Sequence, residues 1–330
     1  MKSISVDKTW DGRRLTRFLQ KTLPAAPMGQ IRKFLRLGRI KVDGKKGTEE
    51  TVLSEGSVVD LYIEDSFFEE IEREDPFYSK IRPKLTILYE DAHIMLLSKR
   101  AGLICHPDEG EKVHTLLTYA QAYLYQKGEW NPRRDFAPAL CNRIDRFTAG
   151  IVIFAKTEEA LRAMDAKIRT HEVQKYYLCI VHGRMKYPEG TLRHFLFKKP
   201  EQKKVTVSRK NEPGSKETIT HYRTADENGG LTLVECLLGT GRTHQIRAQF
   251  AFIGHPLLGD NQYGSAKDNA RYGRNNGQAL CAYRLIFAFE GDTGCLSGLN
   301  GRAFQVKDVP FVKEYFPEVV IPDINGELQE

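Results

Sequence analysis

The chain has 330 residues, of which 41% are hydrophobic and 28% charged, with 50 Lys and Arg against 43 Asp and Glu. This composition indicates a globular protein of about two domains and excludes a disordered or fibrous chain. No segment approaches the ~20 apolar residues of a membrane span, and residues 1–14 lack the apolar stretch of a secretory signal, so we expect a cytoplasmic protein without membrane contact.

The first 63 residues read as one small domain. Apolar residues recur at helical spacing over 15–23 and again over 31–35, which predicts two short helices. Apolar and polar residues then alternate over 39–46 and 58–63 around an Asp-Gly turn, a pattern typical of a β-hairpin. We therefore expect an N-terminal domain at 1–63 with two helices and a hairpin.

This domain also holds the excess positive charge of the chain. Residues 11–47 contain eleven Lys and Arg against two Asp. Such a cluster is the electrostatic footprint expected for a phosphate backbone, and a solvated basic face is the plain alternative. The candidate RNA-binding side chains here are Arg13, Arg14, Arg17, Arg32, Lys33, Arg36, Arg39 and Lys41. The domain resembles the small RNA-binding domain shared by ribosomal protein S-four and many RNA-modifying enzymes.

Residues 64–83 are acidic at first and then contain two prolines without clean periodicity, which predicts a linker. From residue 84 the pattern becomes α+β. Strands are predicted at 87–91, 94–99 and 151–156, and helices at 115–125 and from Thr157 to about Arg169. The domain is therefore expected to continue over 84–330.

The last third of the chain alternates polar and apolar segments. Residues 198–217 are polar and Lys-rich, which predicts hairpins with mobile tips. Strands are predicted at 231–238 and 283–289. Arg242 and Thr243 are expected at the N-terminus of a helix that ends at Gly254, where Arg247 would share the face of Thr243 and help to hold an anion.

A second candidate site residue precedes the strand at 151–156. Asp145 lies between Arg143 and Arg146 in what we expect to be a loop at the mouth of a sheet. For an isolated aspartate the plain interpretation is a surface ion pair. The arginine-rich turn before residue 254 likewise has a plain interpretation, a capped helix with arginines facing solvent.

Together, however, these segments resemble the signature blocks of the RluA-type family of pseudouridine synthases. NRIDRFTAG at 142–150 is similar to its HRLDxxTSG block, and residues 241–264 are similar to its GRTHQIRVHLAxxGHPxxGDxxYG block. SKRAGLICHP at 98–107 and VQKYYLCIVHG at 173–183 resemble two more blocks in the same order. The departures at Arg100, Asn142, Ile144 and Ala149 remove none of the chemically functional side chains.

The resemblance implies a pseudouridine synthase fold, a mixed and largely antiparallel sheet with a central cleft, and neither metal nor organic cofactor. By position, it makes Asp145 the catalytic carboxylate, Arg247 its ion-pair partner and Tyr177 the ring that stacks on the target base. Arg143 and Arg242 become candidates for RNA contact. An arginine beside a partly buried carboxylate favours the ionised form that a nucleophile or base requires.

The reaction implied is isomerisation of uridine to pseudouridine in structured RNA, with large-subunit (23S) ribosomal RNA as the expected target. Transfer RNA is the alternative target. A non-catalytic RNA-binding or ribosome-assembly factor on the same scaffold is a hypothesis of another class. A base deaminase would need a zinc motif such as HxE with PCxxC, and the six Cys and nine His show no such spacing. No heptad pattern suggests an oligomer, so a monomer without an obligate protein partner is expected.

Overall fold

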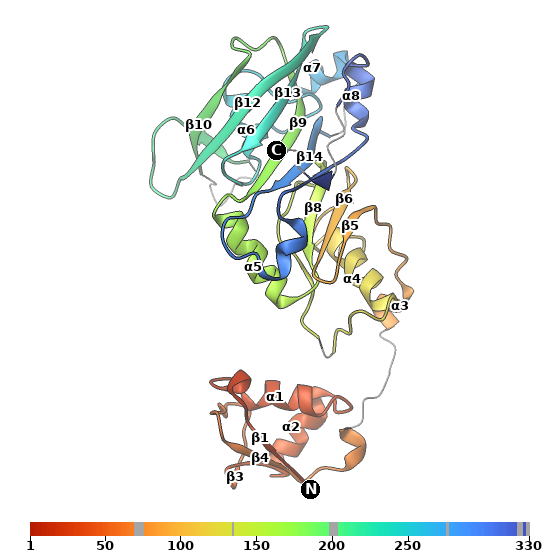
Figure 1. The fold of residues 1–330 in the computed structure, drawn as a ribbon, viewed down its shortest axis with the longest axis vertical. Helices are drawn as coiled ribbons and strands as arrows, with labels where there is room; N and C mark the ends of the chain where they lie inside the picture. The colour runs from red at the N-terminus through yellow and green to blue at the C-terminus, as the bar shows by residue number, and fades with distance from the viewer. Residues whose placement is uncertain (69–75, 134, 198–203, 275–276, 322–325, 328–330) are drawn as a thin grey trace. The chain divides into compact units, whose positions relative to one another are not determined.

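The computed structural model describes residues 1–68, 76–133, 135–197, 204–274, 277–321 and 326–327. The chain divides into two compact units (Figure 1). The first comprises Met1–Lys80 and Leu124–Phe136, and the second comprises Ile81–Tyr123 and Ala137–Glu330. None of the helices in the described ranges is long and apolar enough to cross a membrane.

The first unit is built on a four-stranded antiparallel sheet in the order β1-β4-β2-β3. Its elements are β1 (Lys2–Ser5), η1 (Lys8–Trp10), α1 (Leu15–Thr22), α2 (Met28–Arg36), β2 (Ile40–Val42), β3 (Lys45–Lys46), β4 (Val58–Leu61), η2 (Asp65–Phe67) and α3 (Pro76–Lys80). Both expected helices and the hairpin are present. Strand β1, which the sequence pattern did not predict, adds an edge beside β4.

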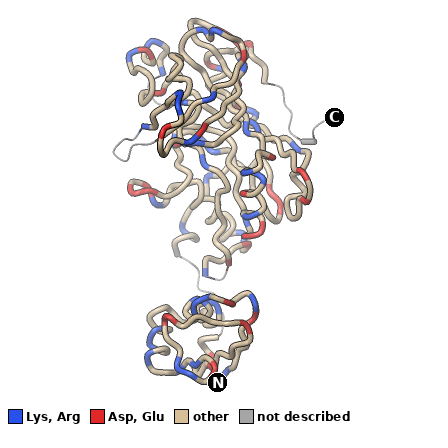
Figure 2. Tube along the Cα trace, turned by 90° about the vertical axis from the view of Figure 1, so that its left-hand side faces the viewer, with Lys and Arg blue, Asp and Glu red and all other residues tan. Residues whose placement is uncertain are grey.

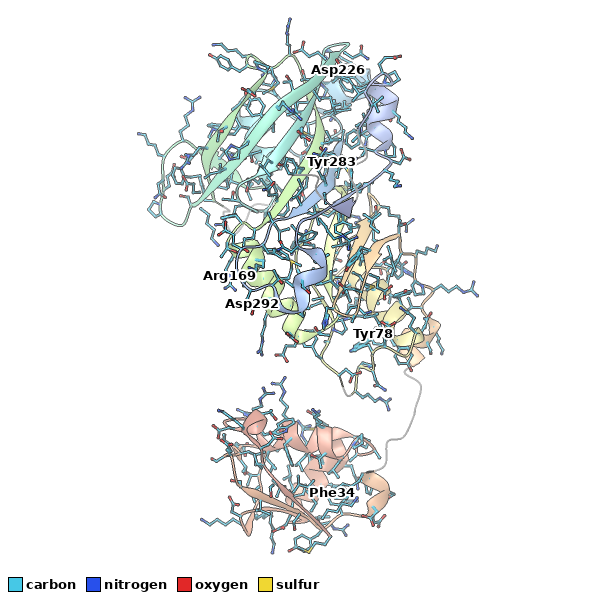
Figure 3. All side chains as sticks on the ribbon, in the orientation of Figure 1. Phe34, Tyr78, Arg169, Asp226, Tyr283 and Asp292 are labelled. Atoms are coloured by element: carbon cyan, nitrogen blue, oxygen red, sulfur yellow. The ribbon has the colours of Figure 1, made fainter. Side chains whose placement is uncertain are left out.

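One apolar cluster holds this unit together. Leu15, Leu19 and Ile31 are fully buried, and Phe34 is almost fully buried in the same cluster (Figure 3). The β2–β3 turn places Asp43 and Gly44 at φ of 49° and 75°. Two central residues with positive φ are what a tight hairpin requires, since this twist matches that of the strands.

The segment predicted as a linker, 64–83, contains short helical elements where it is described. Helix η2 lies at its start and α3 near its end, while 69–75 lie outside the described residues. In α3, the ring of Tyr78 contacts Trp130 edge to face at 5.0 Å between centroids. The first unit therefore includes residues 124–136, which no local sequence pattern associates with it.

The second unit contains the remaining elements, except that residues 124–126, the end of helix α4, belong to the first unit. They are β5 (Ile87–Glu90), β6 (Ile94–Lys99), α4 (Leu116–Gln126), β7 (Ala139–Leu140), β8 (Ala149–Ala155), α5 (Glu158–Arg169), β9 (Val173–His182), β10 (Glu189–Phe197), β11 (Thr206–Ser208), β12 (Lys216–Asn228), β13 (Leu231–Leu238), α6 (Gln245–Phe252), α7 (Ala266–Arg271), β14 (Leu280–Phe287), η3 (Gly294–Leu299), β15 (Arg302–Gln305), α8 (Pro310–Tyr315) and β16 (Gly326–Glu327).

Most of these strands form one sheet in the order β11-β10-β12-β13-β9-β14-β8-β6-β5, with β7, β15 and β16 attached beside that path. The pairings are antiparallel except for β14 with β8, which is parallel. This is the mixed, largely antiparallel sheet expected from the sequence. Strand β14 therefore joins two antiparallel halves, and the loops at this junction carry the candidate site.

Burial follows from this arrangement. Residues 150–155 of β8 are buried without alternation, as expected for a strand covered on both faces. Met164 of α5 packs against this part of the sheet with Ile151 and Ile153. A second cluster around Ile180 and Tyr283 lies on the other half of the sheet (Figure 3 labels Tyr283).

The predicted start of the helix at Thr243 is wrong. Helix α6 begins at Gln245, and the preceding His244 has a left-handed conformation with φ of 55°. Thr243 therefore lies outside the helix and does not share a helical face with Arg247. The Gln245 side chain instead accepts a hydrogen bond from the backbone N–H of Arg242 at 3.0 Å.

Candidate active site

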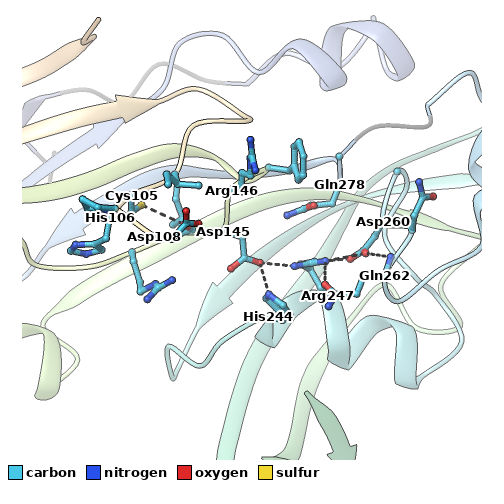
Figure 4. Close-up of a pocket in the computed structure, with 18 residues that line it drawn as sticks. Cys105, His106, Asp108, Asp145, Arg146, His244, Arg247, Asp260, Gln262 and Gln278 are labelled. Atoms are coloured by element: carbon cyan, nitrogen blue, oxygen red, sulfur yellow. Dashed lines mark hydrogen bonds and ion pairs between the residues drawn. The ribbon is translucent and has the colours of Figure 1, made fainter. Parts of the chain in front are cut away.

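Asp145 lies in the loop that leads into β8. The backbone N–H of Thr148 donates to the carbonyl oxygen of Asp145 at 3.1 Å, which closes a tight turn. The Asp145 side chain is 27% exposed and points toward α6 (Figure 4). The turn thus presents one carboxylate, held near the end of a buried strand, to an open cavity.

Arg247 joins this carboxylate to a second one. Its Nη1 donates to Asp145 Oδ2 at 2.8 Å, while Nε and Nη2 donate to the two oxygens of Asp260 at 2.7 and 3.1 Å. Nη2 also donates to Gln262 Oε1 at 2.8 Å. The two oxygens of Asp260 form a bidentate contact with the planar guanidinium, which fixes the direction in which Nη1 points. Asp145 therefore meets a cation that is already oriented.

Burial makes this arrangement strongly electrostatic. The side chains of Arg247 and Asp260 are 7% and 1% exposed. Burial by itself would lower the pKa of Arg247, but the carboxylates of Asp260 and Asp145 outweigh it and raise the pKa above its ordinary value. Arg247 is therefore a permanent cation.

His244 approaches the same oxygen from another direction. Its Nε2 lies 3.7 Å from Asp145 Oδ2, and its Nδ1 is hydrogen-bonded to the Tyr263 hydroxyl at 2.9 Å. A left-handed backbone is uncommon for a residue with a side chain and clusters at functional sites. Within the described residues, both side-chain contacts of Asp145 fall on Oδ2.

Two adjoining cavities share Asp145. The larger has a volume of about 660 Å³, within the range of about 300–1,000 Å³ that is usual for ligand sites. The smaller, of about 60 Å³, is lined by Tyr177, Leu238 and Leu280 as well as Asp145. Tyr177, which is 8% exposed, therefore forms part of the wall of the smaller cavity beside Asp145.

Tyr177 comes from β9, at the position that pairs with Ala282 of β14 and Cys236 of β13. Burial first, and then the Asp145 carboxylate, raise the pKa of Tyr177 well above its ordinary value. Its hydroxyl consequently stays protonated at physiological pH, and the side chain offers an aromatic face and a neutral donor.

Lys99 is a buried residue that contacts the turn at Asp145–Thr148. Its side chain is 1% exposed, and its Nζ donates to the carbonyl oxygens of Leu103 at 2.6 Å, Arg146 at 3.0 Å and Arg100 at 3.2 Å. Burial lowers the pKa of Lys99 to about 8. Three carbonyls match the three N–H groups of an ammonium ion, so Lys99 ties the Asp145 turn to the loop after β6.

The other predicted site residues divide into two groups. Arg143 is exposed and lines both cavities, and Arg242 is exposed and lines the smaller one. The predicted RNA-binding residues at 13–41 belong to the first unit, where seven are exposed and Lys41 is half-buried. Figure 2 shows the concentration of Lys and Arg along that part of the chain.

Four further polar residues at the site had no predicted role: Lys99, His244, Asp260 and Tyr263. Each lies in a recognised block, but a block alone does not say which of its polar residues face one another. Asp260 carried the clearest signal, because an Asp after Gly in a turn that follows an arginine-bearing helix is a natural ion-pair partner. Only the folded chain shows that Asp145 and Asp260 share one guanidinium.

Comparisons with known proteins identify the family. A family profile described as RNA pseudouridylate synthase matches residues 93–252, which include Asp145, Tyr177 and Arg247. A ribosomal large subunit pseudouridine synthase C of Vibrio cholerae is 32% identical over 270 residues, covering 81% of this chain and 82% of that protein. This chain belongs to the RluA-type family of RNA pseudouridine synthases. It is an isomerase whose substrate is RNA.

Other similar proteins support the same family. An uncharacterised RNA pseudouridine synthase of Aquifex aeolicus is 31% identical over 258 residues, covering 76% of this chain and 77% of that protein. Among solved structures, human RNA pseudouridylate synthase domain containing 4 is 20% identical with a TM-score of 0.50, covering 61% of this chain and 83% of that one. The latter similarity confirms the pseudouridine synthase fold.

Proposed function

We propose that this pseudouridine synthase uses Asp145 as its catalytic carboxylate, with Arg247 as its ion-pair partner and Tyr177 as the aromatic support for the target base. The observation that carries this proposal is the 2.8 Å contact between Arg247 and Asp145 beside the buried ring of Tyr177. Segments about 100 residues apart in sequence meet there.

The arrangement suits the isomerisation of uridine. The bond from ribose C1′ to uracil N1 breaks, the base turns, and C1′ bonds to C5, while N1 gains a proton and C5 loses one. Asp145 would act through Oδ1, either as nucleophile or as base, with Oδ2 held by Arg247. The smaller cavity at Tyr177 would retain the detached uracil, which keeps the rejoining step effectively unimolecular.

We also propose that the target lies in large-subunit ribosomal RNA, with transfer RNA as the alternative. The name of the Vibrio cholerae relative, a ribosomal large subunit pseudouridine synthase, supports the first choice. The basic segment 11–47 of the first unit, which contains its two helices and hairpin, would position the enzyme through phosphate contacts that carry no sequence information. Its exposed Arg and Lys side chains support this role.

The proposal is tested with RNA that carries tritium at uridine C5, prepared from cells lacking this chain. The native protein should release tritium, because the C5 proton is lost in the product. Asp145→Asn keeps the shape but removes the charge, and it should lower the rate by at least about a thousandfold, as loss of a nucleophile or base does in other enzymes.

Asp165→Asn, an exposed position on α5, is the matched control and should retain native activity. Sequencing the modified RNA then identifies the target uridine and decides between ribosomal and transfer RNA. Unchanged tritium release by Asp145→Asn would refute the assignment of the catalytic residue. RNA affinity without release by the native chain would favour the non-catalytic assembly factor.

A further inference from the structure

Phe147 is an exposed aromatic residue beside the candidate catalytic carboxylate. Its side chain is 44% exposed, and it lines the larger cavity together with Asp145. Burying a phenylalanine is worth roughly 1.5–3 kcal/mol, so an exposed ring at a site calls for an explanation. Tyr62, Phe77, Tyr187 and Phe252 are the other aromatics exposed to a similar degree among the described residues, and none of them lines this cavity.

The Phe147 ring is exposed, but hydrogen bonds hold the turn that carries it. Arg146 and Phe147 are the two central residues of the turn closed between Asp145 and Thr148. The carbonyl oxygen of Arg146 accepts hydrogen bonds from the buried Lys99 ammonium at 3.0 Å and from the backbone N–H of Gly102 at 2.8 Å. The turn is thus anchored on the protein side, and its tip presents a pre-oriented ring toward the cavity.

Two further contacts define the surroundings of the ring. A methyl group added at Gly277 would lie 3.1 Å from Phe147, so the ring rests against a residue that leaves room for it. The Arg146 guanidinium lies 5.8 Å from the ring centroid (Figure 4 shows Arg146 at the cavity). A cation next to an exposed ring is a combination suited to a base and its phosphate.

We propose that Phe147 forms a second base-binding surface, on which a nucleotide next to the target uridine stacks, with Arg146 contacting the adjacent phosphate. This inference rests on the proposed function, because it takes the Asp145 cavity as the place where the uridine is inserted. Tyr177 would support the uridine in the smaller cavity, and Phe147 its neighbour at the mouth of the larger one.

The physical need for such a surface arises from base extrusion. A uridine that leaves its helix or loop exposes one face of each flanking base and loses its own stacking, which costs a few kcal/mol. An aromatic ring already held at the mouth covers one of these faces and recovers part of that loss. The benefit appears only once the uridine has been extruded, so Phe147 should raise the rate more than the affinity for unextruded RNA.

The experiment uses the full chain and a short RNA that contains the uridine identified by sequencing. Phe147→Ala should lower kcat/KM roughly tenfold, as expected for loss of one stacked base, and Phe147→Trp should retain activity. Phe252→Ala is the matched control, because Phe252 is 41% exposed and has the Arg209 guanidinium 5.8 Å from its ring. It should change kcat/KM less than twofold. Thermal melts show whether each variant is folded.

Two modified RNAs, lacking the base on the 5′ or the 3′ side of the uridine, complete the test. On one of these two RNAs, the native enzyme should react only as fast as Phe147→Ala does on the unmodified RNA. On that same RNA, Phe147→Ala should react no more slowly than on the unmodified RNA, because removing the base and removing the ring abolish the same contact. The proposal is overturned if Phe147→Ala has the same kcat/KM as Phe252→Ala. It is also overturned if the decrease in kcat/KM caused by Phe147→Ala adds to the decrease caused by the missing base on both modified RNAs. Failure of the proposed function differs, since there Asp145→Asn stays active or the native chain releases no tritium.

Discussion

At the scale of single residues, the site depends on two buried cations with different partners. Arg247 lies between two carboxylates, and Asp260 makes the more buried of its ion pairs. Breaking a buried pair by removing one partner leaves a charge without compensation and is strongly destabilising, by about 3–5 kcal/mol. Asp260 is thus the residue that allows Arg247 to be placed beside Asp145 at all.

Lys99 is held by carbonyl oxygens, which are dipoles and compensate its charge less completely than carboxylates would. Burial consequently lowers its pKa to about 8, from a usual value of 10.5. Below pH 8 the ammonium is charged in both the folded and the unfolded state, and the full penalty of burying it remains. Between pH 8 and 10.5 the unfolded chain binds more protons than the folded one, so this penalty is relieved as pH rises.

Lys99→Met tests this directly. The free energy of unfolding of the native protein, measured with denaturant, should rise relative to that of the variant by about 1–2 kcal/mol between pH 7 and pH 9.5. Other groups that titrate in this range are common to both proteins and cancel in the difference. A difference that stays constant with pH, or that moves in favour of the variant, would show that Lys99 does not titrate in the folded state near pH 8.

At the scale of secondary-structure elements, the parallel pairing of β8 with β14 determines where the Asp145 turn lies. Gly150, at the start of β8, has a φ of 117°, and a methyl group there would overlap the carbonyl group of Ala282 on β14. The two backbones approach so closely only because position 150 has no side chain. This contact places the end of the Asp145 turn directly against the strand next to Tyr177.

Gly150→Ala should therefore destabilise the protein far more than a strained backbone alone would. The control is Gly254→Ala, where φ is 89° and an added methyl group meets nothing within 4 Å. The control should lose about 1–2 kcal/mol of stability, the usual penalty of a left-handed conformation. Gly150→Ala should lose at least twice as much, or fail to accumulate as folded protein. Equal melting temperatures for the two variants would contradict the close approach of the strands.

Two helices show when a local sequence pattern is sufficient to predict where a helix begins. Thr157 was expected to begin α5, and its hydroxyl accepts a hydrogen bond from the backbone N–H of Ala160 at 3.2 Å. A cap of this kind depends on residues three positions apart, so sequence reveals it. The start of α6 was misplaced because His244 adopts a left-handed conformation, in which its Nδ1 meets the hydroxyl of Tyr263. That partner lies 19 positions away and leaves no local signal.

At the scale of the whole molecule, positive charge is concentrated in one segment of the chain rather than in a whole unit. The excess of positive charge lies in residues 11–47, and the exposed Arg and Lys of α1 and α2 belong to it. Attraction to phosphates should therefore come mainly from the 11–47 segment of the first unit, while the second unit would carry the proposed catalytic site. Such attraction depends on salt, because bound cations release counterions from the RNA.

Replacing both Arg17 and Lys33 by Gln should weaken RNA binding and reduce its dependence on salt. Each phosphate contact contributes about 0.7–0.9 to the slope of log affinity against log salt concentration, so two contacts should lower the slope by roughly 1.5. The matched control replaces the exposed Arg162 and Arg169 of α5 by Gln. Binding measured from low to high salt should separate the two proteins, and identical slopes would place the RNA elsewhere.

Sequence by itself determined the family, the largely antiparallel fold and most elements of both units. Periodicity and turns depend on neighbouring residues, and the signature blocks are long enough to be recognised without a fold. It also singled out Asp145, Arg247 and Tyr177, which the structure brings together.

Only the tertiary structure decided how the site is assembled. The sharing of Arg247 by Asp145 and Asp260, the burial of Lys99 under the turn and the exposure of Phe147 at its tip all join segments distant in sequence. Such contacts result from the packing of β8 against β14 and from the path of the chain after α6. No local periodicity encodes them, because the direction of each side chain is set by the strand or turn that carries it.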